Sequence, residues 1–265
     1  MAADPMRILA IHAHPDDVEF LCAGTLALLA EAGHRVTIAT MTPGDCGSAE
    51  LDPVAIAAIR RKEAAEAARL IDAEYRCLEF RDLAIFSDDD SRRRVVELLR
   101  AVRPDLVLTA SPVDYMADHE ATAALVRDAC FIAPIPNYKT RQWDPAPPTE
   151  RIPHLYYVDP IEGIDHFAAI QPVGFHVDVT RVFPIKQRML ACHDSQRSWL
   201  AAHHGMDEYL DSQRRWGSHR GGEIGVDQAE GFRQYLGHAY PRTNLLLELL
   251  EQDGRGGRIG ATCIV

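Results

Sequence analysis

Two histidines and two aspartates are crowded into one short segment, HAHPDD, near the start of the chain. An apolar run, Ile8–Ile11, leads directly into this segment, and a second apolar run follows it. Burying ionisable groups in a packed core costs free energy unless they are paired or bind a metal. Imidazole and carboxylate groups are ligands of catalytic zinc, which leaves one position open for water or substrate. The segment therefore predicts a metal or acid–base site, with His12, His14, Asp16 and Asp17 as candidates.

A metal site built on this segment needs a further ligand from elsewhere in the chain, and His119 is the candidate. Together with His14 and Asp17 it would give two imidazoles and one carboxylate, a set that suits a catalytic zinc ion. Such an ion lowers the pKa of its bound water toward about 7. Asp16 lies beside a ligand but is free to face that water, so it is placed to act as the general base.

The first half of the chain alternates strand-like and helix-like segments. This alternation predicts a Rossmann-like, three-layer α/β/α fold with a mostly parallel sheet. Right-handed crossovers favour the strand order 3-2-1-4-5, followed by C-terminal additions. The first and fourth strands are then neighbours, so the loops HAHPDD and SPVDYMADHE meet where such sheets bind ligands. The expected strands are 8–11, 35–41, 76–80 and 106–109, and the expected helices are 18–32, 53–71 (N-cap Asp52), 91–102 (N-cap Ser91) and 119–130.

The second half of the chain carries weaker signals. Residues 133–153 are rich in proline and predict a long loop or lid rather than an interdomain linker. The glycine-rich segment 217–225 predicts a loop that carries His219 and Arg220. The other expected elements are two strands, a mainly helical stretch and a last short helix, over 154–158, 175–179, 184–209 and 227–236.

The composition of the 265-residue chain is that of an ordinary globular protein, with 47% hydrophobic and 25% charged residues. A net charge of −11 argues against a nucleic-acid partner, because phosphate binding needs clustered Lys and Arg. The six cysteines are scattered without a CxxC pair, which indicates free thiols in a reducing compartment. A signal-peptide pattern is missing, and no stretch approaches about 20 uninterrupted apolar residues. We therefore expect a cytoplasmic protein without a membrane span, and a homo-oligomer stays open.

The sequence AHPDDVEF, followed by CAGTLA, closely resembles the signature of the LmbE/PIG-L-like deacetylases. This family includes the N-acetylglucosaminyl-phosphatidylinositol deacetylases and the deacetylases of the mycothiol and bacillithiol pathways. The resemblance spans residues 7–236, and the HPDD motif is its specific part. The weaker matches are R-x-x-E at Arg60 and Glu63, RDL at 81–83, Asp118–His119, HDSQ at 193–196 and AEGF at 229–232.

The resemblance implies a single LmbE-like domain over residues 1–265, in which 133–225 form variable loops and helices of the substrate pocket. It implies a zinc-dependent hydrolase that removes an acetyl or other acyl group from an amine, on an N-acetylglucosamine-type sugar or conjugate. Fe²⁺ or another divalent metal is the alternative to zinc. A metal-activated water would attack the amide, with Asp16 as the general base. The implied metal ligands are His14, Asp17 and His119, and the implied substrate-binding residues include Arg60 and Asp82.

The chain departs from the family pattern at Met116. Many members carry a histidine there, three residues before the third ligand, which helps to stabilise the tetrahedral oxyanion. Methionine cannot donate a hydrogen bond, and removing such a donor typically costs on the order of a hundredfold in rate. Tyr115, His219 or Arg220 could substitute. We hypothesise that His219 does so, because a glycine-flanked loop can fold over a pocket, and that Arg220 contacts the substrate.

Other interpretations stay open. A His/Asp/His set also matches the two-His-one-carboxylate site of non-haem iron enzymes, although those sites usually lie in all-β barrels. A metal-binding or regulatory homologue that has lost catalysis would explain Met116. A dehydrogenase is a weaker alternative, because HAHPDD replaces the glycine turn that a dinucleotide needs. At the level of single residues, Asp16 or Asp17 could cap a helix, and Arg60 could pair with Glu63 on a helix surface.

Overall fold

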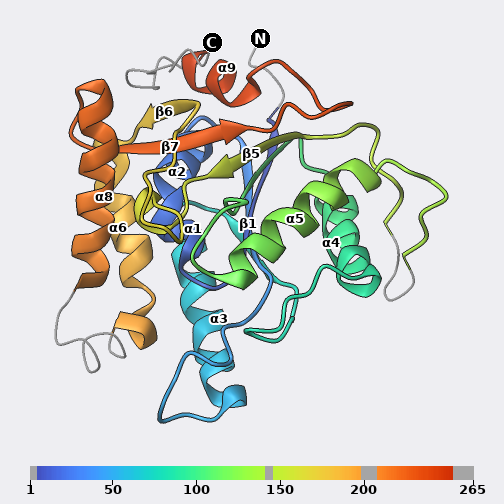
Figure 1. Ribbon diagram of the computed structural model, residues 1–265, viewed down its shortest axis with the longest axis horizontal. Coiled ribbons are helices and arrows are strands. Elements are labelled where there is room, and N and C mark those ends of the chain that lie inside the picture. Colours follow the sequence, from blue (N-terminus) through green and yellow to red (C-terminus); the bar gives the residue numbers. More distant parts are fainter. Residues whose placement is uncertain (1–4, 141–145, 198–207, 253–265) are drawn as a thin grey trace.

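A seven-stranded sheet with helices on both faces forms the body of the molecule (Figure 1). The computed structural model describes residues 5–140, 146–197 and 208–252. The strands are β1 (Arg7–His12), β2 (Arg35–Thr40), β3 (Glu74–Cys77), β4 (Leu106–Thr109), β5 (His154–Val158), β6 (Phe175–Asp178) and β7 (Ala229–Gln234). Their order is β3-β2-β1-β4-β5-β7-β6; the first five are parallel, and β7 is antiparallel to both of its neighbours. The predicted fold class and strand order, with C-terminal additions, are therefore confirmed.

The helices form two layers because successive strand residues point to opposite faces of the sheet. In β1, Ile8 and Ala10 face one apolar core, and Leu9 and Ile11 face the other. The first core packs against α1 (Asp17–Leu21), α2 (Ala23–Glu31), α3 (Pro53–Arg69), α6 (Phe183–Ala191) and α9 (Leu245–Gln252), and the second packs against α4 (Asp89–Val102) and α5 (Ala117–Ile132). Helix α8 (Glu208–Ile224) packs on β7, and two 3-10 turns are η1 (Ile161–Gly163) and η2 (Thr180–Val182).

Local side chains set where two of the central helices begin. The Asp52 carboxylate accepts hydrogen bonds from the backbone N–H groups of Val54 and Ala55, and this confirms the predicted cap of α3. The cap of α4 is Asp88 rather than Ser91, because the Asp88 carboxylate accepts from the Ser91 N–H at 2.8 Å. Three acidic residues precede Ser91. The first of them, Asp88, has the extended backbone (φ −111°, ψ −178°) that an N-cap residue adopts.

Cys22 interrupts the helix that was predicted over residues 18–32. Its backbone, with φ −139° and ψ 10°, ends α1 and starts α2. The first turn of α2 receives its acceptor from a distant strand, since Glu230 accepts from the N–H groups of Gly24 and Thr25, each at 2.8 Å. A Cβ at Gly24 would lie 2.9 Å from Glu230 Oε1, so glycine permits this close approach. A carboxylate from β7 therefore caps α2 in place of a local side chain.

In the last third of the chain, the structure differs from two predictions. Residues 217–225 do not form a glycine-rich loop, because 217–224 belong to α8. Glycine lets this helix pack closely on the sheet: a Cβ at Gly217 would lie 2.2 Å from Gln228 Oε1. Residues 227–236 do not form a helix, because 229–234 are strand β7, buried between β5 and β6. Close packing thus outweighs the low intrinsic helix propensity of glycine in α8.

Lys186 of α6 supplies the counter-charge for Glu230. Its Nζ donates to Glu230 Oε1 at 2.6 Å, and both side chains are buried. Removing one partner of a buried ion pair leaves an uncompensated charge in the core. We therefore expect Lys186→Met to lower the free energy of unfolding by about 3–5 kcal/mol, as measured by urea denaturation. A loss below about 1 kcal/mol would contradict this, because it would show that the backbone N–H groups alone satisfy the carboxylate.

Two expectations from the composition can be compared with the structure of the described residues. None of the helices there is both long enough and apolar enough to cross a membrane. The cysteines in those ranges (Cys22, Cys46, Cys77, Cys130 and Cys192) are free thiols. Cys263 lies outside the described residues.

Candidate active site

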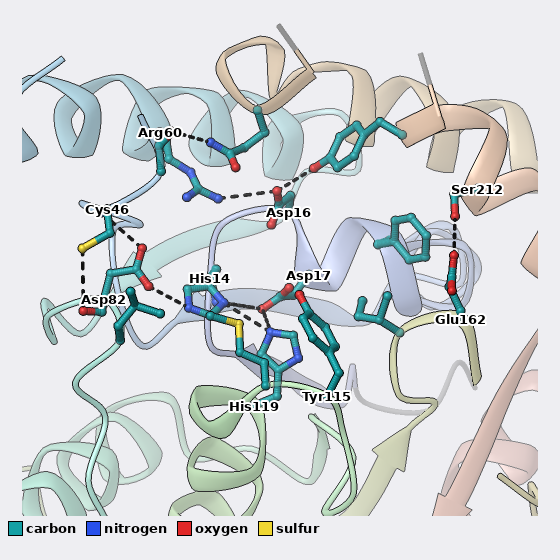
Figure 2. A pocket seen from close by; sticks show the side chains of 17 residues that line it. His14, Asp16, Asp17, Cys46, Arg60, Asp82, Tyr115, His119, Glu162 and Ser212 are labelled. Carbon is teal, nitrogen blue, oxygen red and sulfur yellow. Dashed lines mark hydrogen bonds and ion pairs between the residues drawn. The ribbon is translucent and has the colours of Figure 1, made fainter. Parts of the chain in front are cut away.

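The loops that follow β1 and β4 lie side by side, because these two strands are hydrogen-bonded neighbours. His14 in the first loop and His119 at the start of α5 have ring centroids 5.3 Å apart. The predicted meeting of the two loops is therefore confirmed. Both histidines open onto a cavity of about 540 Å³, which Figure 2 shows with the side chains of its 17 lining residues.

Three donor atoms of the predicted metal ligands form a nearly equilateral triangle. His14 Nδ1 lies 3.3 Å from Asp17 Oδ2 and 3.3 Å from His119 Nε2, and the third side, His119 Nε2 to Asp17 Oδ2, is 3.4 Å. Zinc–ligand bonds of about 2.0–2.1 Å at tetrahedral angles place neighbouring ligand atoms about 3.3–3.4 Å apart. All three side chains are buried and line the cavity. The spacing of the donor atoms therefore fits a metal ion such as zinc, which these three side chains would hold.

The other ring nitrogen of each histidine faces a carboxylate. His14 Nε2 lies 3.0 Å from Asp82 Oδ1, and His119 Nδ1 lies 3.0 Å from Asp114 Oδ1. A carboxylate in this position fixes the histidine tautomer, so that the opposite nitrogen presents its lone pair. Asp82, which the resemblance placed among the substrate-binding residues, lines the cavity and also contacts a candidate ligand.

Asp17 lies among positive or hydrogen-bonding neighbours. Its Oδ2 is 2.6 Å from His12 Nδ1 and accepts a hydrogen bond from the His14 backbone N–H at 2.8 Å. Burial alone would raise the pKa of Asp17, but the charges of His12 and His119 outweigh burial and hold this pKa well below its ordinary value. Burial would lower the pKa of His14, and its hydrogen bonds to Asp118 and other carboxylates reverse that effect. The cluster is therefore an electrostatic setting that favours a cation.

Asp16 is held separately from the neighbouring Asp17. Its backbone lies in the left-handed region, with φ 99°, and its side chain makes no capping hydrogen bond to α1. The Asp16 carboxylate instead accepts from the Tyr209 hydroxyl at 2.6 Å and lies 3.4 Å from Arg60 Nη2 (Figure 2). Burial raises the pKa of Asp16, and the Arg60 charge offsets part of this increase. The two adjacent carboxylates therefore have different partners and different tendencies to bind a proton.

Arg60 is buried in α3 rather than exposed on the helix surface. Its Nη2 donates to the Pro15 carbonyl oxygen at 2.8 Å, and its Nη1 donates to the Gly44 carbonyl oxygen at 3.3 Å. Gly44 has φ +70°, and a Cβ there would lie 2.1 Å from Arg60 Nη1, so only glycine fits this turn. The alternative, a surface pair with Glu63, is not formed, because Glu63 accepts from the Ser195 N–H and hydroxyl instead. Arg60 thus joins the turn before Asp16 to the loop after β2, and it lines the cavity.

His219 and Arg220 lie outside the residues that line the cavity. The flexible loop on which the His219 hypothesis depended is part of α8. The His219 ring stacks on the Trp216 ring with centroids 4.7 Å apart. Arg220 is buried, and its guanidinium donates to both carboxylate oxygens of Asp159 at 2.8 and 3.0 Å. The structure therefore brings neither residue to the histidine cluster.

Tyr115 and Met116 do line the cavity, next to His119. The Tyr115 and His119 rings meet edge to face, with centroids 5.5 Å apart. The Tyr115 side chain is 65% exposed, and its hydroxyl can donate a hydrogen bond. Of the three residues considered as substitutes for the oxyanion histidine, Tyr115 is the one beside the candidate ligands.

Several residues of the site escaped the sequence interpretation. Asp114 could have been found, because a ligating histidine usually needs a carboxylate on its second nitrogen and the loop before His119 offers one. Gln196 lies in the HDSQ motif, and its amide donates to the Gly47 carbonyl at 3.0 Å. Three further residues reach the cavity from η1 and α8: Glu162, Tyr209 and Ser212. They lie within residues 133–225, the part expected to form the pocket, but no motif singled them out individually.

The fold and the site together define a Rossmann-like α/β protein with a histidine–carboxylate cluster at the carboxyl ends of its parallel strands. Residues 9–130 match the PIG-L family, described as GlcNAc-PI de-N-acetylase. The matched segment contains the whole cluster around His14 and His119. This match, together with the relatives and solved structures below, confirms the resemblance to the LmbE/PIG-L-like deacetylases.

Two relatives of similar sequence have names that denote different activities, a deacetylase and a hydratase. The diacetylchitobiose deacetylase of Thermococcus kodakarensis is 27% identical over 207 residues, which cover 73% of this chain and 71% of that protein. The 4-oxalmesaconate hydratase of Pseudomonas putida is 27% identical over 199 residues, which cover 71% and 73%. Among solved structures, N,N'-diacetylchitobiose deacetylase from Pyrococcus horikoshii superposes with a TM-score of 0.75 at 26% identity, covering 91% of this chain and 89% of that one.

Proposed function

We propose that the protein is a zinc-dependent N-deacetylase that removes an acetyl group from a small N-acetylglucosamine-type sugar or conjugate. The observation that carries this proposal is the triangle of His14, Asp17 and His119 donor atoms beside the separately held carboxylate of Asp16. The PIG-L match and the relatives named as deacetylases support it. We further propose that residues 133–225 supply the substrate-specific wall of the pocket, since Glu162 and Tyr209 reach the cavity from this part.

In this proposal His14, Asp17 and His119 hold the metal ion. When bound, the ion polarises the amide carbonyl and lowers the pKa of a water molecule. Asp82 and Asp114 keep the two imidazoles in the tautomer that the ion needs. Fe²⁺ accepts the same donor types. Elemental analysis of the purified protein, followed by reloading of the metal-free protein with each ion, identifies the metal that supports turnover.

Asp16 moves the proton. It takes a proton from the attacking water while the C–O bond forms, and it returns the proton to the nitrogen when the C–N bond breaks. Acetate and an amine are the products. Tyr115 is our candidate for the hydrogen-bond donor to the oxyanion, because Met116 cannot fill that role. We also propose that Arg60 and Asp82 help to bind the substrate, because both side chains line the cavity.

A screen of N-acetylated compounds on the zinc-loaded protein tests the function. The panel contains N-acetylglucosamine, N,N'-diacetylchitobiose, an N-acetylglucosaminyl conjugate and a non-sugar acetamide, and free amine is measured by fluorescamine. Amine release that requires zinc and is lost in Asp16→Asn is the expected result. Oxygen-dependent turnover with iron and no amine release would instead favour a non-haem iron enzyme.

A hydratase is the second candidate, because one relative of equal identity is named as a 4-oxalmesaconate hydratase. Both reactions add water, to an amide carbon in one case and to a carbon–carbon double bond in the other. A parallel assay follows the ultraviolet absorbance of unsaturated dicarboxylic and tricarboxylic acids. Loss of that absorbance without amine release would replace the deacetylase proposal. Metal binding without either activity would favour the regulatory homologue that Met116 suggested.

Tyr209 should raise kcat by holding Asp16 in place. Its hydroxyl donates to the Asp16 carboxylate at 2.6 Å, and hydrogen bonds to charged groups are worth about 1.5–3 kcal/mol. We expect Tyr209→Phe to lower kcat about tenfold or more with KM changed less than about twofold, because each 1.36 kcal/mol is tenfold in rate. Steady-state kinetics with measured metal content checks this. Tyr138→Phe is the matched control, since it removes a hydroxyl that binds Asp89 outside the cavity.

A further inference from the structure

Glu162 forms part of the cavity wall away from the histidine cluster. It lies in η1, the short turn after β5, and its backbone is in the left-handed region with φ 57°. The Ser212 hydroxyl of α8 donates to Glu162 Oε1 at 3.4 Å. Figure 2 shows this pair at the opposite end of the cavity from Cys46 and Asp82. The cavity therefore has an exposed carboxylate at the end opposite Cys46 and Asp82.

The described residues that line the cavity carry an excess of negative charge. Four carboxylates, those of Asp16, Asp17, Asp82 and Glu162, face a single guanidinium, that of Arg60. A divalent cation on neutral imidazoles would still leave one net negative charge. Like charges brought together at a binding site weaken binding and exclude wrong partners.

The guanidinium of Arg60 is already engaged. Its two terminal nitrogens donate to the carbonyl oxygens of Pro15 and Gly44, and one of them also lies 3.4 Å from Asp16 Oδ2. The side chain is buried. A phosphate or carboxylate on a substrate would have to break these contacts to use Arg60 as a counter-ion. Among the described lining residues, no second Lys or Arg offers a substitute.

We propose that Glu162 determines specificity by selecting uncharged or cationic sugars and rejecting sugars that carry a phosphate or carboxylate. This inference rests on the proposed function and narrows its substrate class. A carboxylate accepts hydrogen bonds from sugar hydroxyls and attracts a cationic substituent that lies at its end of the cavity. The same charge repels anionic substituents, so the pocket also disfavours an unsaturated polycarboxylic acid as substrate.

Binding of product-like amines tests this selection without requiring turnover. The dissociation constants of glucosamine, glucosamine 1-phosphate and glucosamine 6-phosphate are measured by calorimetry on the zinc-loaded protein. We expect glucosamine to bind at least about tenfold more tightly than either phosphate. Glu162→Gln keeps the shape and removes the charge, and it should reduce this preference at least about threefold for one or both phosphates. Asp211→Asn is the matched control, since it removes an exposed carboxylate of α8 that does not line the cavity.

The outcomes separate the inference from the function. Equal or tighter binding of the phosphates, no binding of glucosamine, or a preference that survives Glu162→Gln would overturn the role of Glu162. The same holds if Asp211→Asn reduces the preference as much as Glu162→Gln does. Failure of the deacetylase proposal is read from a different measurement, the absence of amine release across the N-acetylated panel, and the binding preference can be present in either case.

Discussion

Replacing Asp16 with asparagine is expected to lower kcat by about 10²–10⁴-fold, the range that general acid–base catalysis contributes. Asparagine has the same shape and can still accept the Tyr209 hydrogen bond, but it cannot take a proton from water. The candidate metal donors on His14, Asp17 and His119 are untouched, because Asp16 contacts Tyr209 and Arg60 instead. Steady-state kinetics on protein of known zinc content measures the effect.

The metal content is the control for this variant. Asp16→Asn should retain zinc at the wild-type stoichiometry, so that the loss of rate reports on the proton and not on the ion. Full activity in Asp16→Asn would remove Asp16 from the reaction. Loss of zinc together with loss of rate would instead indicate that Asp16 belongs to the metal site, against the division of roles that we propose for the two carboxylates.

Replacing His119 with alanine is expected to weaken zinc binding at least about 100-fold, beyond the 10–100-fold typical of a residue that only orients a ligand. The reason is that His119 Nε2 is one corner of the donor triangle, 3.3 Å from His14 Nδ1 and 3.4 Å from Asp17 Oδ2. Competition with a chromogenic chelator measures the affinity. Turnover should fall in parallel and recover in part at high zinc concentration.

His219→Ala is the matched control for His119→Ala. The His219 ring stacks on Trp216 and does not line the cavity, so we expect zinc affinity and kcat close to wild type. Zinc affinity in His119→Ala within tenfold of wild type would contradict the ligand assignment. A large loss of kcat in His219→Ala with normal zinc affinity would restore the role that the sequence suggested for that residue.

The N-terminal half of the molecule could be predicted because its signals are local. Apolar runs such as Ile8–Ile11 and 106–109 end in polar loops, and parallel pairing with short crossovers leaves few topologies. The two loops then had to meet, and the structure places His14 and His119 with ring centroids 5.3 Å apart. The chemistry of the cluster followed from residue types alone, which is why the candidate ligands could be named before their geometry was known.

The C-terminal third could not be predicted because its elements are decided by distant contacts. Gly217 indicates a loop by its own preference, yet it lies in a helix that needs a small residue against Gln228. Glu230 looks like an exposed helical residue, yet it is buried because Lys186 and two backbone N–H groups surround it. Tyr209 is separated from Asp16 by most of the chain, so nothing in the local sequence links the two.

The carboxylate of Glu230 has a consequence for the order in which the chain can fold. It caps helix α2 through Gly24, 206 residues earlier in the sequence. Strand β6 likewise joins the sheet through β7, which follows it in the chain. During synthesis, the N–H groups at the start of α2 and the Lys186 ammonium group therefore lack their carboxylate partner until β7 has left the ribosome. Contacts of such long sequence separation form slowly, so the nascent protein should expose incompletely packed apolar surface until β7, the last strand of the described residues, is available.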